Sequence, residues 1–294
     1  MALSPGPYED SLGSTAVLRF KVQSKQKIMM PSDYHMHTPL CHHAVGDPVD
    51  YAQQALNIGL SEIGMSDHSP MPKDDFDDWR MAYSDLESYV SMVKLAQNRY
   101  PQISILLSLE TDFLPGHEPW IKTLSSQYDW DYLIGSVHYV NEDWDLDNPK
   151  KLSQWKLRDP FEVWSMYFKR LTQAAASGLF QIIGHADLCK KFCFYPKEDC
   201  SKLFDEFLEA AASTGTAIEL NTAGLRKDCK EIYPAPNILR VANQKGVKIT
   251  FGSDAHKPSE VGADFEKAIQ LAKECGFTHW CRFKQRKAFS VPLV

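Results

Sequence analysis

The chain has 294 residues, of which 44% are hydrophobic and 24% charged, a composition typical of a globular protein with a substantial core. Its net charge of −6 argues against a general affinity for nucleic acid, which usually requires a basic face. The net charge does not exclude a small anionic substrate, because bound metal ions change the local charge.

The first 31 residues differ from the rest of the chain. Residues 1–31 mix glycine, proline, serine and a few charges without a hydrophobic period, and we expect a flexible leader there. They lack the basic and apolar segments of a signal peptide. From residue 32 on no linker divides the sequence, so we predict a single domain over 32–294.

Short apolar runs and amphipathic stretches alternate along this domain. Asp-Pro pairs at 47–48 and 159–160 place a hydrogen-bond acceptor before a first-turn proline, as at a helix start. In chain order the predicted elements are strand 33–37, helix 48–58, strand 62–67, helix 85–98, strand 104–110, helix 118–125, strand 132–138, helix 160–176, strand 181–185, helix 197–214, strand 217–221, helix 234–245, strand 248–252, helix 261–275 and strand 279–283. This alternation predicts an α/β fold, a single TIM-like barrel of parallel strands.

The predicted strands end in residues that can bind metal ions, where loop residues are usual. These residues are His35, His37, Asp67, His68, Glu110, His138, His185, Asp254 and His256. The C-terminal ends of parallel barrel strands meet on one rim, where such folds carry their chemistry. We therefore expect these side chains to converge on one site.

The spacing and type of these residues indicate the metals. His35 and His37 are two residues apart, so an extended strand points both to the same face, and Asp254 and His256 repeat that spacing. Imidazoles mixed with carboxylates suit Zn²⁺, Mn²⁺ or Fe²⁺, whereas Ca²⁺ and Mg²⁺ sites are nearly all oxygen. So many ligands exceed the needs of one ion, and we expect two or three.

A single histidine at a strand end is more often structural than a ligand. We assign that structural role to His117, His279 and one of the pair His42 and His43. The seven cysteines are an odd, dispersed set, which favours a reducing cytoplasm over a disulfide framework. Cys189, Cys193 and Cys200 could hold a zinc ion, but buried or incidental thiols are the preferred interpretation.

Seven stretches of the chain resemble the polymerase-and-histidinol-phosphatase (PHP) family, and within it the histidinol-phosphate phosphatases. They are residues 33–44, 66–70, 109–113, 135–139, 184–188, 220–227 and 252–256. The resemblance implies a distorted (β/α)7 barrel with three metal ions at the C-terminal rim of its strands. It places His35, His37, Glu110 and Asp254 at the first ion, Glu110, His138 and His185 at the second, and His43, His68 and His256 at the third. Asp67 would then not bind an ion itself but would orient one of the residues that do.

The resemblance also implies the reaction. Metal ions can acidify a water and neutralise the phosphoryl oxygens, so that no nucleophilic serine or cysteine is required. We expect hydrolysis of L-histidinol phosphate to L-histidinol and phosphate, a step of histidine biosynthesis, with Asp254, His256 and Glu110 as catalytic residues. Arg226 is the predicted phosphate-binding arginine, and Arg158 is a second candidate. The acidic and aromatic segment 139–147 would suit a cationic leaving group.

Other functions remain as alternatives. A related phosphoesterase could act on nucleotides, on another small monoester or on DNA ends, although the acidic net charge argues against DNA. An amidohydrolase barrel also opens with His-x-His but uses a lysine after its fourth strand, where this chain has His138. A non-catalytic metal-binding protein is the third alternative. No stretch reaches the roughly 18 apolar residues of a membrane-spanning helix, so we expect a cytoplasmic protein without membrane or nucleic-acid partners.

Overall fold

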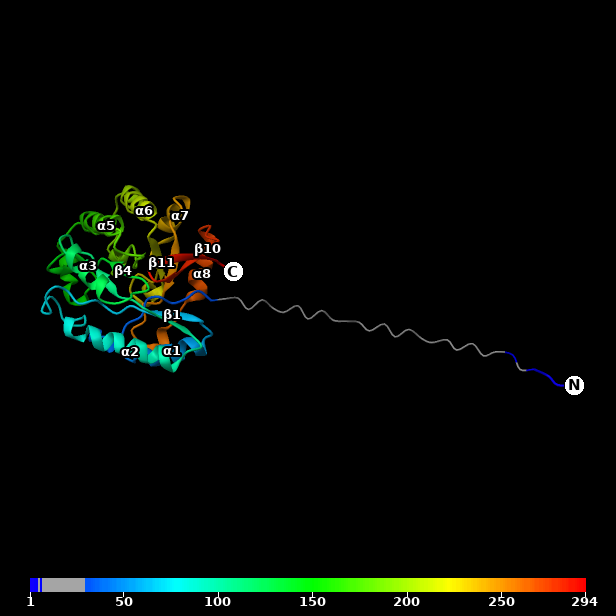
Figure 1. The fold of residues 1–294 in the computed structure, drawn as a ribbon. Coiled ribbons are helices and arrows are strands. Elements are labelled where there is room, and N and C mark those ends of the chain that lie inside the picture. The colour runs from blue at the N-terminus through cyan, green and yellow to red at the C-terminus, as the bar shows by residue number, and fades with distance from the viewer. Residues whose placement is uncertain (5, 7–29) are drawn as a thin grey trace.

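Parallel strands run through the centre of the molecule, and helices lie around them (Figure 1). The computed structural model describes residues 1–4, 6 and 30–294, so most of the predicted leader 1–31 lies outside the described residues. The helices are α1 (Pro48–Asn57), α2 (Leu86–Arg99), α3 (Glu118–Gln127), α4 (Ser153–Lys156), α5 (Pro160–Ala176), α6 (Ser201–Thr214), α7 (Pro236–Gln244) and α8 (Phe265–Glu274). The strands are β1 (Glu62–Met65), β2 (Ser104–Leu107), β3 (Glu110–Asp112), β4 (Ile134–Ser136), β5 (Tyr139–Asn141), β6 (Trp144–Asp145), β7 (Ile182–Ile183), β8 (Ala217–Asn221), β9 (Ile249–Gly252), β10 (His279–Lys284) and β11 (Lys287–Pro292).

The central sheet is parallel, as the alternation of elements predicts. Its strands run in the order β3-β4-β7-β8-β9, and β1 pairs with β2, again in parallel. All residues of β1, β8 and β9 are buried, because helices cover the sheet. The predicted mixed α/β fold with parallel strands is therefore confirmed.

Helix α5 illustrates how the local sequence sets these elements. The side chain of Asp159 accepts a hydrogen bond from the backbone N of Phe161 at 2.7 Å, and Pro160 occupies the first turn. The helix buries one face, which includes Trp164 and Phe168, and Gly178 follows its end with a φ of 67°. Both ends of α5 lie where the sequence predicts them.

The predicted first strand, 33–37, is not a continuous strand. Asp33 forms an isolated parallel bridge to Ile63, and Met36 forms one to Ala255. Side chains replace part of the backbone ladder between these bridges: the Asp33 carboxylate accepts from the backbone N of His35, and Ser66 Oγ accepts from that of Met36. The segment is thus held on both sides by backbone hydrogen bonds, but its pairing is reduced to isolated bridges.

Several other predicted elements are shorter in the structure; strands 62–67, 132–138 and 181–185 become β1, β4 and β7, and helix 261–275 becomes α8. The predicted strand 104–110 is divided into β2 and β3, because the hydroxyl of Tyr89 donates to the carbonyl of Ser108 at 2.7 Å and replaces a ladder bond. The predicted helix 197–214 begins only at Ser201, where Asp199 caps the first residue through two hydrogen bonds. The hairpins β5–β6 and β10–β11 were only partly foreseen: β10 was predicted, but β5, β6 and β11 were not.

The buried carboxylate of Glu62 in β1 ties the C-terminal hairpin to the sheet. It accepts hydrogen bonds from Tyr34, from Ser32 at 3.1 Å and from Arg282 Nε of β10 at 2.9 Å. Burial alone would raise the pKa of Glu62, but its bonds with Arg282 and Tyr34 hold that pKa below its ordinary value. Among the residues described, none of the helices combines the length and apolar character needed to cross a membrane.

Candidate metal centre

The predicted ligands come together at the C-terminal ends of the strands. His68 follows β1, Glu110 begins β3, and His138 and His185 follow β4 and β7. With His43, Asp254 and His256 these residues line one cavity of about 550 Å³. His35 and His37 lie behind it and are fully buried.

Glu110 lies at the middle of the cluster. Its Oε2 is 2.8 Å from Nδ1 of His68 and 3.2 Å from Nε2 of His35. Its Oε1 is 2.8 Å from Nε2 of His185 and 3.7 Å from Nε2 of His138. Since both oxygens face several imidazoles, this carboxylate is positioned to bridge two cations.

The cluster continues from Glu110 to the loop after β9. Oδ1 of Asp254 lies 3.1 Å from Nε2 of His37. Nε2 of His256 lies 2.9 Å from Nε2 of His43, a distance at which two imidazole nitrogens repel unless a proton or a cation lies between them. Both residues of the pair His42 and His43 are exposed, but His42 has a left-handed φ of 65° and only His43 lines the cavity.

Five of the histidines have Nδ1 held by an acceptor, which turns Nε2 toward the cluster. His138 Nδ1 lies 2.9 Å from Asp112, and His35 Nδ1 lies 2.8 Å from Glu219. The remaining three pairs are His37 with Asp67, His43 with the carbonyl of Cys41, and His256 with the carbonyl of Asp254. Such partners fix the tautomer and ring orientation of metal-binding histidines.

Asp67 therefore lies where the sequence predicts an orienting carboxylate, whereas Asp112 and Glu219 were not foreseen. The signal for Asp112 is its place two residues after Glu110, on the same strand face. Glu219 is a lone charge inside the buried strand β8. Its approach to His35 depends on Gly252, where an added Cβ would lie 1.8 Å from the Glu219 carboxylate.

The ligand atoms fit divalent ions. His35, His37 and Asp254 offer atoms within 4.8 Å of one another, as do His35, Glu110 and His185. A third such group joins His37, His68 and His256, and the thiol of Cys41 lies within reach of His43 and His256. His35 Nε2, His68 Nδ1 and Glu110 Oε2 are buried and lie close to one another, but among the described residues none of them forms a hydrogen bond of suitable geometry. Buried polar atoms of this kind require a partner, and a cation would supply it.

Charges within the cluster shift its pKa values in opposite directions. Burial alone would raise the pKa of Glu110, but His35, His68 and His138 hold it well below its ordinary value. Burial would lower the pKa of His138, but Asp112 and Glu110 raise it to about 10. For His256, burial and the adjacent His37 keep the pKa well below its ordinary value. The surroundings therefore favour an ionised Glu110 and a neutral His256, the forms in which these two groups can bind a cation.

The two predicted phosphate-binding arginines lie in different surroundings. Arg226 lines the cavity; its Nη2 donates to the carbonyl of Ser253 at 2.6 Å, while its Nη1 is buried without a partner. Arg158 is not among the residues that line the cavity. Its guanidinium lies 4.5 Å from the ring of Trp144, and its Nη1 donates to the carbonyl of Gln154 at 3.0 Å. Lys191 and Lys227, which the sequence did not single out, do line the cavity.

An acidic and aromatic hollow of about 520 Å³ adjoins the cavity and shares Trp79 and Asp145 with it. The ring of Trp79 stands edge-on to His68 and stacks with Tyr139 at 6.0 Å between centroids. Of the predicted segment 139–147, residues Tyr139, Glu142, Asp143 and Asp145 line this hollow. Trp144 does not; it is buried against Trp155.

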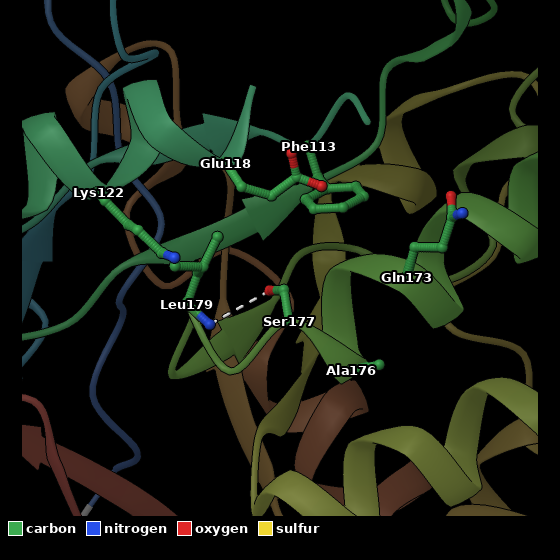
Figure 2. A pocket seen from close by; sticks show the side chains of 7 residues that line it. All are labelled: Phe113, Glu118, Lys122, Gln173, Ala176, Ser177 and Leu179. Atoms are coloured by element: carbon green, nitrogen blue, oxygen red, sulfur yellow. Dashed lines mark hydrogen bonds between the residues drawn. The ribbon is translucent and has the colours of Figure 1, made fainter. Parts of the chain in front are cut away.

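A separate, more open hollow of about 350 Å³ lies between α3 and the end of α5 (Figure 2). Its lining consists of Phe113, Glu118, Lys122, Gln173, Ala176, Ser177 and Leu179. Ser177 Oγ accepts from the backbone N of Leu179 at 3.2 Å, as a turn cap (Figure 2). None of the predicted ligands lies there, so the chemistry belongs to the histidine-lined cavity.

Comparisons with known proteins agree with this placement. The model of the PHP domain matches residues 33–223. A probable histidinol-phosphatase of Deinococcus radiodurans is 41% identical over 245 residues, which cover 83% of this chain and 93% of the relative. The histidinol-phosphatase of Bacillus subtilis is 30% identical over 266 residues, or 82% of this chain and 99% of the relative.

Solved structures show the same fold. The histidinol phosphate phosphatase of Lactococcus lactis, determined with zinc, L-histidinol and phosphate, superposes with a TM-score of 0.74 at 21% identity. The superposition covers 89% of this chain and 99% of that one. A second structure, of a protein from Listeria monocytogenes, gives a TM-score of 0.71 at 23% identity, over 80% of this chain and 99% of that one.

Proposed function

Because the chain belongs to the PHP domain family, we propose that it is a metal-dependent phosphomonoesterase that hydrolyses L-histidinol phosphate to L-histidinol and phosphate. Two relatives at 30% identity or more, named histidinol-phosphatase or probable histidinol-phosphatase, support this substrate and a place in histidine biosynthesis. The observation that carries the proposal is Glu110, whose two oxygens each face imidazoles from different strands. A carboxylate so placed is suited to hold two cations beside one phosphate.

We assign the ligands to three divalent ions (zinc, manganese or iron). His35, His37, Glu110 and Asp254 would hold the first ion, Glu110, His138 and His185 the second, and His43, His68 and His256 the third. The contacts of Glu110 with His35 and His185 support the first two sets, and the close approach of His43 to His256 supports the third. Bound there, such ions would acidify a water and neutralise charge on the phosphoryl oxygens.

The strands that carry these ligands are consistent with the distorted (β/α)7 barrel. The isolated bridges of Asp33 and Met36 place segment 33–37 between β1 and β9. A further parallel bridge, between His68 and Glu110, connects the end of β1 to β3. We therefore infer that residues 32–294 form one domain in which seven strand positions follow one another around a ring.

The chain's own residues then have distinct tasks. Asp67, Asp112 and Glu219 orient imidazoles through Nδ1, and Arg226 has a free N–H to donate to a phosphate oxygen. We retain Asp254, His256 and Glu110 as the residues nearest the reacting atoms. The acidic hollow beside Trp79 would take the cationic amine and imidazole of the leaving group, because carboxylates and aromatic faces both attract cations.

The alternative is a PHP phosphoesterase for nucleotides or other small monoesters. The acidic hollow disfavours a nucleoside di- or triphosphate, whose additional phosphates would face Asp75, Asp77 and Asp78. Phosphate release should be measured on metal-loaded protein with L-histidinol phosphate beside nucleotides and sugar phosphates. If L-histidinol phosphate were hydrolysed no faster than the others, the substrate would be wrong while the reaction class remained.

A further inference from the structure

The cavity contains an ordered ammonium group that the ligand assignments leave without a role. Nζ of Lys191 donates to Oδ2 of Asp147 at 2.9 Å and to the backbone carbonyl of Asp147 at 2.6 Å. Both residues line the cavity, and the Lys191 side chain is only 15% exposed. A lysine held by two acceptors loses little further freedom when it contacts a ligand, so this one is preorganised.

The backbone of Lys191 is fixed by its neighbour Lys190, which is fully buried. The ammonium of Lys190 contacts Asp187 at 2.9 Å, Glu231 at 3.0 Å and the carbonyl of Ile232 at 2.9 Å. The carbonyl of Lys191 itself accepts from the backbone N of Cys229 at 3.2 Å. These contacts hold residues 187–191 against the loop after β8, so Lys191 has a defined position at the cavity wall.

The carboxylate that holds Lys191 lies beside one half of the ligand cluster. Burial would raise the pKa of Asp147, but Lys191, His138 and His185 lower it to about 2. Asp147 is thus ionised at neutral pH and near the Glu110–His138–His185 set. Arg226 contacts the opposite part, at Ser253 and Asp254. Lys191 and Arg226 therefore line the cavity from different loops, those that follow β7 and β8.

The other cations of the cavity are less suited to give up a proton. Arg226 carries a guanidinium, which stays protonated in proteins. Lys150 lies at the rim, where its side chain is 78% exposed and pairs with the similarly exposed Asp78. Lys227 also lines the cavity, but among the described residues its ammonium forms no ion pair that would fix its position. The histidines and carboxylates of the cluster are assigned to ions. Lys191 combines a transferable proton, a fixed position and shielding from bulk water.

We propose that Lys191 is the proton donor to the leaving group and that Asp147 is its positioning residue. The proposal rests on the phosphomonoesterase activity proposed above. As the ester P–O bond breaks, its electron pair passes to the alcohol oxygen, which takes a proton from Nζ. The oxygen of the attacking water forms the new bond to phosphorus, and this water releases one proton to the solvent. The neutral amine regains a proton from water before the next turnover.

Two leaving groups test this role. An alkyl phosphate such as L-histidinol phosphate releases a strongly basic alkoxide, whereas p-nitrophenyl phosphate releases a phenolate that leaves without a proton. We expect Lys191→Met to lower kcat for the alkyl ester by about 10²–10³-fold and for the aryl ester by about 2-fold or less, as for the loss of a general acid. Lys191→Arg should show the same pattern, because it keeps the charge but not the transferable proton.

Asp147→Asn should lower kcat for the alkyl ester with little change in KM. Lys197→Met, at an exposed lysine of the same segment, serves as the control for Lys191→Met and should leave kcat unchanged. Metal content and inhibition by inorganic phosphate should stay at wild-type levels in both Lys191 variants. Equal losses on both esters, or full alkyl activity in Lys191→Arg, would overturn the proposal. The kcat losses on an alkyl and an aryl ester can be compared with any alkyl phosphate that the wild type hydrolyses. If the wild type did not hydrolyse L-histidinol phosphate, that result would count only against the proposed function.

Discussion

Replacing Asp112 by Asn tests whether the partners behind the imidazoles shape the metal centre. Asp112 is buried between His138 Nδ1, 2.9 Å from its Oδ1, and Arg80 Nη2, 2.9 Å from its Oδ2. The amide removes the negative charge from both contacts while keeping the shape. His138 would then lose the partner that favours its present orientation, and Arg80 would lose one of two carboxylates.

The expected magnitude follows from these contacts. Removing one partner of a buried ion pair costs about 3–5 kcal/mol. Because Arg80 keeps Asp77 at 2.7 Å and the carbonyl of Ser69 at 3.1 Å, we expect the lower end, about 3 kcal/mol. Loss of an orienting partner typically lowers metal affinity by about 10–100-fold.

Urea unfolding of the metal-free protein and competition titration with a chelator measure the two effects separately. Asp129→Asn, at an exposed aspartate, provides the matched control and should leave both quantities unchanged. A stability loss below about 1 kcal/mol together with unchanged metal affinity would refute the reasoning, since it would make Asp112 an ordinary polar residue.

Three further predictions have distinct expected outcomes. Glu110→Gln should lower the metal content per chain by two ions, and an unchanged stoichiometry would argue against a bridging carboxylate. Arg226→Met should lower kcat/KM by about 10–100-fold, as for the loss of a charged hydrogen bond, whereas Arg158→Met should change it by less than about 2-fold. Because the folded pKa of Glu62 is lowered, its contribution to stability is present above the unfolded pKa and is lost as the pH falls through the folded one. The free energy of unfolding of Glu62→Gln should therefore vary less below about pH 4.3 than that of the wild type, and parallel pH profiles would contradict this.

The sequence predicted the elements whose ends are marked by local chemistry. Helix α5 has the predicted bounds because Asp159, Pro160 and Gly178 act within a few residues of its ends. Segment 33–37 was predicted as a strand, but the hydrogen bond from the backbone N of Met36 to Ser66 Oγ, which replaces a backbone bond, depends on tertiary placement.

The same distinction applies to the metal centre. The C-terminal ends of parallel barrel strands meet on one rim. The convergence of Glu110, His138 and His185 could therefore be predicted from their places at the ends of predicted strands. The group that accepts a hydrogen bond from Nδ1 of each imidazole could not be predicted in this way. His35 and Glu219 are 184 residues apart, and their contact depends on strand order and on the absence of a side chain at Gly252.

The orienting carboxylates come from strands other than those of the histidines they hold, and this makes their effects interdependent. Asp112 acts on His138 and Glu219 acts on His35, yet both imidazoles face Glu110. If one ion is weakened, the shared carboxylate loses part of its position, and the second substitution then costs less. We therefore expect the metal affinity of the double variant Asp112→Asn/Glu219→Gln to deviate from the sum of the single effects by about 0.5–3 kcal/mol, whereas additivity within about 0.5 kcal/mol would show that Glu110 does not couple the two ions.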